Sequence, residues 1–366
     1  MKSYRHILTT ILFAAMLMLA GGCVHEFPDE ETPGGDGKAA VRLDLRLLAG
    51  EMPLYKTITV GGDASDATRA PSETPRMRYI VEVYDTDDLP GANRGRGLQT
   101  RAPIERISFT IPADEVTTDR YVDLRLEPGD YTFYAWSDYI DGDGRESLFY
   151  NATDLADITV VAAADGSHPG STDLRQAFLG HTEAAVPEPA PVPDIATGQV
   201  PTTEITVEMS RPLAKFVFIS TDLDEFINSR RQAAGHSSDR APQLSDYSVK
   251  VIYSGYMPVA FDAFIDRPFD ARLGQWFMSR PQIIDSTQAM LGFDFMFVNG
   301  AEAGVQLALE IYDTATGEKI GSTGTITAPL LRGRTTEIRG RFLSSQAESG
   351  VGVNPDFDGD YNIEIR

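Results

Sequence analysis

Apolar and polar residues alternate along most of this 366-residue chain, and this period of two limits the folds open to it. Every second residue is apolar over 41–48 and 77–84, and the pattern recurs over 107–111 and 305–311. Such alternation predicts β-strands that turn one face toward a core, since an amphipathic helix would repeat every three to four residues. The sequence therefore predicts an all-β fold.

Turn residues and one capped segment add detail to this prediction. Residues 127–130 (EPGD) predict a hairpin between the strands on either side, and residues 314–319 (TATGEK) predict a second hairpin turn. A single helix is expected over 223–231, with Asp222 as its N-cap. Strands at this spacing, separated by turns, favour β-sandwiches.

Prolines mark the expected boundary between two domains. Residues 185–203 contain five prolines, a density that is incompatible with a central strand. The chain is also longer than one core usually organises. We therefore expect an N-terminal β-sandwich over 41–195 and a C-terminal β-sandwich over 202–366.

Residues 1–22 have the layout of a secretory signal. Lys2 and Arg5 precede an apolar run over 7–20, which is shorter than the roughly 20 residues of a membrane-spanning helix. The only cysteine, Cys23, follows two glycines. This layout resembles the bacterial lipobox, in which the thiol receives a diacylglyceryl group and the preceding peptide is removed. The usual leucine three places before the cysteine is Ala20 here.

We expect Cys23 to be lipidated and residues 23–40, which are acidic and rich in Gly and Pro, to form a flexible tether. The alternative is an ordinary signal that leaves a free thiol. Acidic residues at 29–31 resemble the export signal that sends lipoproteins of Bacteroidota-type bacteria to the outer face, although a solvated linker would look the same. The expected location is the outer membrane, lipid-anchored and exposed at the cell surface.

Charge and motifs argue against several functions. The net charge of −22 disfavours nucleic acid and anionic membrane faces as partners. The histidines do not fall at metal-ligand spacing, and the sequence has neither a GxSxG elbow nor a phosphate-cradling loop. We therefore expect no catalytic residues and no cofactor, and the chain is not expected to be an enzyme.

Two weaker signals concern calcium and sugars. Asn354, Asp356 and Asp358 match positions one, three and five of a calcium loop, but position twelve is Ile365 where a Glu is needed. We interpret this segment, and the acidic cluster over 138–144, as polar turns rather than metal sites. The two tryptophans, at 136 and 276, could form a sugar platform, but their strand contexts favour core packing.

Three segments together resemble one known family. They are LRLEPGDYTFYAWSDYID at 124–141, RPLAKFVFISTD at 211–222 and LLRGRTTEIRGRFL at 330–343. With the signal, Cys23 and the acidic tether, they resemble the fimbrillin-like lipoproteins of Bacteroidota-type bacteria. The resemblance implies two tandem transthyretin-like β-sandwiches and a role in surface fimbriae or adhesion without catalysis.

The resemblance also implies a way to assemble. In polymerising members of the family, a protease cuts after an Arg near the N-terminus, and a strand from the next subunit fills the groove that is freed. Arg69 is the candidate processing site here, although anchor members keep their lipid end and would leave it uncut. The candidate donor strand carries Tyr361, Ile363 and Ile365, which could equally complete the chain's own second sheet.

Two functions from different classes remain. The first is a fimbrillin-like structural, anchor or adhesion component that exchanges strands with other fimbrial subunits. It predicts a groove or a removable strand. The second is a glycan-binding surface lipoprotein of a nutrient-uptake system, which predicts exposed aromatic rings lying side by side.

Overall fold

The computed structural model describes residues 37–48, 75–86, 102–142, 147–189, 201–234, 241–300, 302–344 and 362–365. Almost every regular element in these residues is a strand, so the all-β prediction is confirmed. The described helices are α2 (Leu223–Ala234) and three single 3₁₀ turns, η3 (Ala113–Glu115), η4 (Asp173–Arg175) and η6 (Leu244–Asp246). None of the helices in the described ranges is both long and apolar enough to cross a membrane.

The first sandwich is built from two sheets. One has the order β4 (Asp119–Leu126), β1 (Ala39–Leu47), β9 (Thr202–Met209); the other has the order β3 (Glu105–Pro112), β2 (Arg76–Asp85), β5 (Gly129–Ile140), β8 (Ala177–Val186). The alternation in the sequence places Leu43, Val81 and Phe133 in the core between them, where each side chain is at most 1% exposed.

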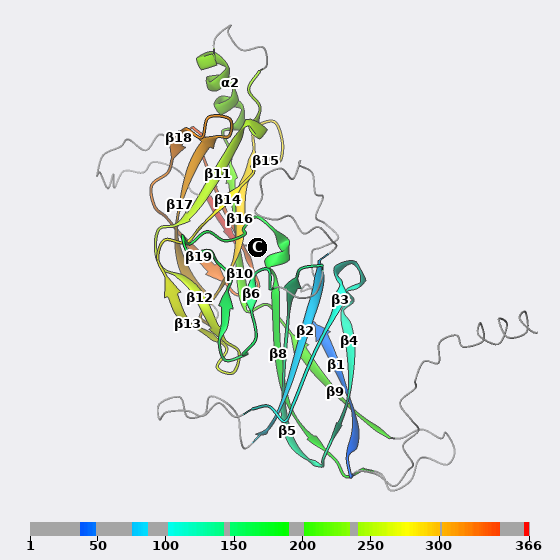
Figure 1. Ribbon diagram of the computed structural model, residues 1–366. Helices are drawn as coiled ribbons and strands as arrows, with labels where there is room; N and C mark the ends of the chain where they lie inside the picture. The colour runs from blue at the N-terminus through cyan, green and yellow to red at the C-terminus, as the bar shows by residue number, and fades with distance from the viewer. Residues whose placement is uncertain are drawn as a thin grey trace, which may run out of the picture.

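The second sandwich also has two sheets. One has the order β15 (Gln282–Ile283), β16 (Ala289–Phe297), β10 (Leu213–Ser220), β20 (Thr335–Gly340), β21 (Asn362–Ile365); the other has the order β14 (Trp276–Ser279), β11 (Tyr247–Tyr253), β17 (Glu302–Asp313), β18 (Lys319–Ser322), with β19 (Ile326–Leu331) also paired to β17. Phe216, Val251 and Leu309 are buried between these sheets. The two sandwiches lie end to end in an elongated molecule (Figure 1).

A small sheet and a shared core connect the two sandwiches. The sheet has the order β13 (Arg267–Arg272), β12 (Met257–Asp262), β7 (Ile158–Val160), β6 (Tyr150–Asn151), so it combines strands from both halves of the chain. Phe297 of β16 faces the first sandwich, with its ring centroid 6.5 Å from that of Trp136 and 5.3 Å from that of Tyr150. Apolar packing therefore continues from one sandwich into the other.

Strand pairing moves the expected boundary between the sandwiches. We expected residues 202–209 to open the C-terminal domain, but they form β9 and pair with β1 in parallel, from Ala40 opposite Thr202 to Leu47 opposite Met209. The proline-rich stretch therefore joins β8 to β9 within the first sandwich. The second sandwich begins one strand later, at Leu213 of β10.

The two expected hairpins had different outcomes. Residues 314–319 connect the antiparallel strands β17 and β18, as predicted, with Gly317 at a φ of +70°. Residues 127–130 instead connect β4 and β5, which lie in different sheets. The hairpin prediction was wrong there, because the same turn composition also serves a crossing between facing sheets.

Candidate functional site

Strand β1 lies at the centre of its sheet and is held on both sides. It pairs antiparallel with β4 and parallel with β9, so its backbone bonds a neighbour along each edge. Its inward side chains are at most 5% exposed; they are Ala39, Val41, Leu43, Leu45 and Leu47. We call the space between β4 and β9 that β1 fills the β1 slot.

The outward face of β1 carries Arg42, Asp44 and Arg46, and Arg46 is ion-paired with Asp44 of the same strand. Arg42 donates from Nε to Asp123 at 2.8 Å, and Arg46 donates from Nε to Asp119 at 3.3 Å. The hydrogen bond from Arg42 holds the pKa of the Asp123 carboxyl below its usual range. Exposed ion pairs of this kind contribute about 0–1 kcal/mol each. The apolar face and the backbone hydrogen bonds therefore hold β1 in place, and the exposed ion pairs add little to its stability.

The covalent link between β1 and the rest of the fold runs through residues 49–74. The backbone N–H groups of Leu47 and Leu48 donate to Thr118 and Met209 at 2.8 and 3.0 Å, and the next described residue is Pro75. Arg69 belongs to this connecting segment, outside the described residues. A cut there would leave β1 joined to the body only by non-covalent contacts.

The C-terminal strand pairs within the chain's own second sheet. In β21, Ile363 lies opposite Ile338 and Ile365 lies opposite Thr336, antiparallel to β20 at the edge of the sheet. Tyr361 lies outside the described residues. This position corresponds to the second of the two roles expected for the segment, completion of the internal sheet.

A buried polar cluster joins the two sandwiches. Asp294 of β16, which is fully buried, lies 3.0 Å from Nε of Arg175 and 2.9 Å from Nε2 of His168, and it accepts a hydrogen bond from the hydroxyl of Tyr253 at 2.7 Å. Arg175 and His168 belong to the connection between β7 of the small sheet and β8 of the first sandwich, whereas Asp294 and Tyr253 belong to the second sandwich. We call these four residues the Asp294 cluster.

The charges in the Asp294 cluster follow from its surroundings. Burial alone would raise the pKa of the Asp294 carboxyl, but the charge of Arg175 and the hydrogen bonds from His168 and Tyr253 bring this pKa below its usual range. Burial and the charge of Arg175 lower the pKa of His168, which keeps its ring neutral. Because a carboxylate only accepts, Nε2 of the neutral ring carries the proton. Asp294 and Arg175 therefore form a buried ion pair, oriented by two neutral donors.

The sequence contains one signal for this cluster. Asp294 interrupts the apolar run AMLGFDFMF of β16, and a charge in the middle of a buried strand needs a partner. The sequence does not show which residues contact Asp294, and His168 lies 126 positions away along the chain.

Several predicted positions lie outside the described residues, namely Cys23, Arg69, Asn354, Asp356, Asp358 and Tyr361. Within the acidic cluster at 138–144, Asp138 is buried and accepts two hydrogen bonds from Arg78, at 2.8 and 2.7 Å. Over the described part of the chain, no group of three or more His, Cys, Asp or Glu side chains is placed to hold a metal ion.

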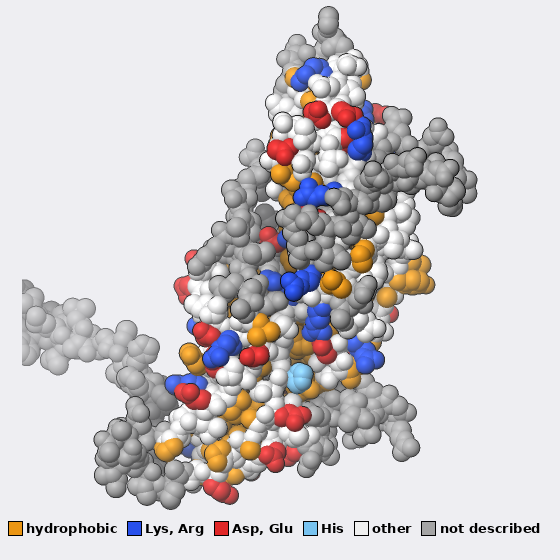
Figure 2. All heavy atoms as spheres, turned by 180° about the vertical axis from the view of Figure 1, so that it is seen from behind, with side chains coloured by type: hydrophobic (Ala, Val, Ile, Leu, Met, Phe, Trp, Pro, Cys, Tyr) orange, Lys and Arg blue, Asp and Glu red, His pale blue; other side chains and the backbone are white. Residues whose placement is uncertain are grey.

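Aromatic side chains are mostly internal. Trp136 is fully buried, and the partly buried Trp276 lies under Lys250, whose Nζ is 4.1 Å from the ring centroid. Among the described residues, the exposed aromatic side chains are Tyr121, Tyr256 and Phe269, on β4, the β11–β12 turn and β13. Figure 2 shows acidic and basic side chains interspersed on one face of the molecule. The described surface thus lacks the row of rings that the glycan-binding alternative predicts.

Comparison with solved structures finds distant similarities. The fimbrial anchor protein Mfa2 from Porphyromonas gingivalis is 10% identical, with a TM-score of 0.41 over 90% of this chain and 97% of that chain. A fimbrial assembly protein from Parabacteroides distasonis is 10% identical, with a TM-score of 0.35 over 90% and 99%. A candidate polysaccharide-binding protein from Bacteroides thetaiotaomicron is 11% identical, with a TM-score of 0.41 over 78% and 79%.

Comparison with sequences gives a family. No curated protein matches this chain. A family model described as a family of unknown function (DUF6562) matches residues 37–366, which include all the strands described above. The chain therefore belongs to the DUF6562 family.

Proposed function

We propose that this chain is a non-enzymatic, cell-surface component of fimbriae or of an adhesion apparatus, and that it joins neighbouring subunits by strand exchange at the β1 slot. The observation that carries this proposal is the position of β1, which fills the centre of a sheet but is linked to the body through one connecting segment. The sequence resemblance to fimbrillin-like lipoproteins supplies the biological setting.

The β1 slot has the properties that strand exchange requires. Removing β1 would expose the apolar surface of the opposing core and the hydrogen-bonding edges of β4 and β9. Each Val or Leu side chain of β1 contributes roughly 1.5–3 kcal/mol by its burial. An empty slot is therefore unstable, and a strand that restores these contacts would bind tightly.

The order of features along the chain links processing to anchoring. Cys23 and β1 both precede Arg69. A cut at Arg69 would separate the lipid-bearing segment from the body, so that only the non-covalent contacts of β1 would keep the body on the membrane. An anchor subunit would therefore retain β1, whereas a polymerising subunit would lose it.

The β1 slot can be tested with a protease site placed in the connecting segment. Residues 66–72 are replaced by the recognition sequence of a specific protease, and the cleaved chain is exposed to mild denaturant and then returned to buffer. Loss of β1 should yield ladders of oligomers on gels, and an excess of a synthetic peptide of residues 37–48 should suppress them. The control peptide has Asp in place of Leu43. A cleaved chain that loses β1 and stays monomeric would rule out exchange at this slot.

Two substitutions in the native sequence test the processing and anchoring steps. Arg69→Ala should abolish cleavage and any ladders in cells, and unchanged ladders would exclude this residue as the processing site. Cys23→Ser should move the chain from the detergent phase to the aqueous phase. Unchanged partitioning of that variant would exclude lipidation at Cys23.

A further inference from the structure

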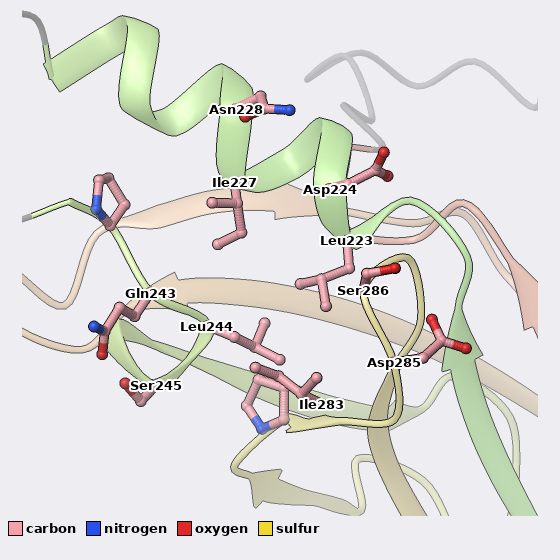
Figure 3. A pocket seen from close by; sticks show the side chains of 12 residues that line it. Leu223, Asp224, Ile227, Asn228, Gln243, Leu244, Ser245, Ile283, Asp285 and Ser286 are labelled. Atoms are coloured by element: carbon pink, nitrogen blue, oxygen red, sulfur yellow. The ribbon is translucent and has the colours of Figure 1, made fainter.

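A pocket of about 630 Å³ lies between α2, η6 and β15, in the second sandwich. We call it the tip pocket, because α2 lies at one end of the elongated molecule (Figure 1). The start of β1 lies at the opposite end. Figure 3 shows Leu223 and Ile227 of α2 pointing toward Leu244 of η6 and Ile283 of β15. Side chains from three separate elements thus form an apolar interior.

The volume of the tip pocket lies in the range of ligand pockets, and its lining combines apolar and polar side chains. Ligand pockets usually measure about 300–1,000 Å³ and combine apolar walls with a few polar groups. Pro242 and Pro281 extend the apolar lining, and prolines make the wall rigid. The apolar surface continues outward, since Ile283 and Ile284 are 66% and 52% exposed. An extended occupant could therefore contact the pocket and the strand beside it.

The rim of the tip pocket is acidic at one side. Asp224 and Asp285 lie on the same side of the pocket in Figure 3. Hydrogen bonds from Thr287 hold the pKa of Asp285 below its usual range, so this carboxylate is charged at neutral pH. Arg341 lies near Asp224 but is ion-paired with Glu225. The residues that line the pocket thus include two acids, Asp224 and Asp285, and neither Lys nor Arg.

We propose that the tip pocket binds a segment of a partner protein that carries aliphatic side chains next to a Lys or Arg residue. The aliphatic side chains would occupy the space between Leu223, Ile227 and Leu244, and the cationic group would lie toward Asp224 and Asp285. This inference is independent of strand exchange. The tip pocket would be a second interaction surface, at the end of the molecule opposite the start of β1. The chain could then hold one partner at each end.

The probe is a phage-displayed library of random heptapeptides, selected on the full chain and measured afterwards as synthetic fluorescent peptides. Selected sequences should be enriched in Leu, Ile or Val together with Lys or Arg. Ile283→Glu should weaken their binding at least tenfold, and this exposed position carries little risk for folding. Asp285→Asn should weaken it severalfold and reduce its dependence on salt. Leu273→Glu, at a position 56% exposed on another part of the surface, is the matched control and should leave binding unchanged.

Several results would overturn the proposal. Selection that yields no sequence above background, or only sequences without basic residues, would contradict it. Binding that Ile283→Glu and Leu273→Glu weaken equally would place the peptide elsewhere. Dodecyltrimethylammonium serves as a second probe, and saturable binding of this amphiphile without binding of any peptide would show a small-molecule site instead of a protein-docking site.

Discussion

Replacing Asp294 by Asn should destabilise the whole fold, because this substitution leaves the guanidinium of Arg175 buried without a counter-charge. Arg175 is 1% exposed, and its Nε lies 3.0 Å from the Asp294 carboxylate. Asn keeps the size of the side chain and can still accept from Tyr253, so the substitution isolates the loss of charge. Removing one partner of a buried ion pair typically costs about 3–5 kcal/mol.

The matched control is Asp123→Asn. Asp123 also pairs with an arginine at 2.8 Å, but both side chains of that pair are exposed. Its loss should cost about 0–1 kcal/mol. A third variant, Arg175→Met combined with Asp294→Leu, removes both charges and should cost less than Asp294→Asn alone. That comparison separates the uncompensated charge from the loss of packing.

Urea unfolding followed by tryptophan fluorescence provides the assay, because the two tryptophans report on different sandwiches. Trp136 lies in the core of the first, and Trp276 lies on β14 of the second. In single-tryptophan variants, Asp294→Asn should shift both transitions by the same free energy, since the cluster and the shared core couple the sandwiches. A shift confined to Trp276, or a cost no larger than that of Asp123→Asn, would refute this reasoning.

Three further predictions follow from individual contacts. Leu43→Ala should reduce the free energy of unfolding by about 2–5 kcal/mol in urea titrations, because Leu43 is fully buried in the β1 slot. Gly180→Ala should destabilise the first sandwich in thermal melts, since an added Cβ would lie 2.3 Å from the carbonyl oxygen of Glu208; an unchanged melting temperature would contradict that close approach. Because burial lowers the pKa of His168, the unfolded chain binds its proton at higher pH than the folded chain, so His168 makes the free energy of unfolding fall as the pH drops below about 6.5. His168→Gln should flatten that part of the stability–pH curve, and a curve identical to that of the wild type would contradict it.

The sequence predicted which residues form strands and which faces they bury, because both depend on local periodicity. Helix α2 also lies where it was expected. The carboxylate of Asp222, which was expected to cap this helix, accepts instead from the backbone N–H of Ser344 at 2.8 Å. Pairing partners were less predictable. Nothing local distinguishes a turn within a hairpin from the 127–130 turn between facing sheets, and the pairing of β9 with β1 depends on contacts far apart in the sequence.

The Asp294 cluster shows the same limit for a polar site. A buried aspartate in an apolar strand predicts that partners exist, but His168 and Arg175 come from the β7–β8 connection, more than 100 residues earlier in the chain. The tip pocket likewise depends on α2, η6 and β15 meeting in space. Cys23 and Arg69 lie outside the described residues, so the predictions of lipidation at Cys23 and of cleavage at Arg69 rest on the sequence alone.

The parallel pairing of β1 with β9 has a consequence for the order in which the chain folds. Residues become available for folding from the N-terminus onward during synthesis, and β1 needs β9, which lies roughly 160 residues later, before its second edge can pair. Closing so long a loop is slow compared with forming neighbouring strand pairs. The three-stranded sheet β4-β1-β9 is therefore completed late, when β9 pairs with the free edge of β1. A strand that arrives late during folding makes few contacts in the transition state, so its contacts chiefly control the rate of unfolding.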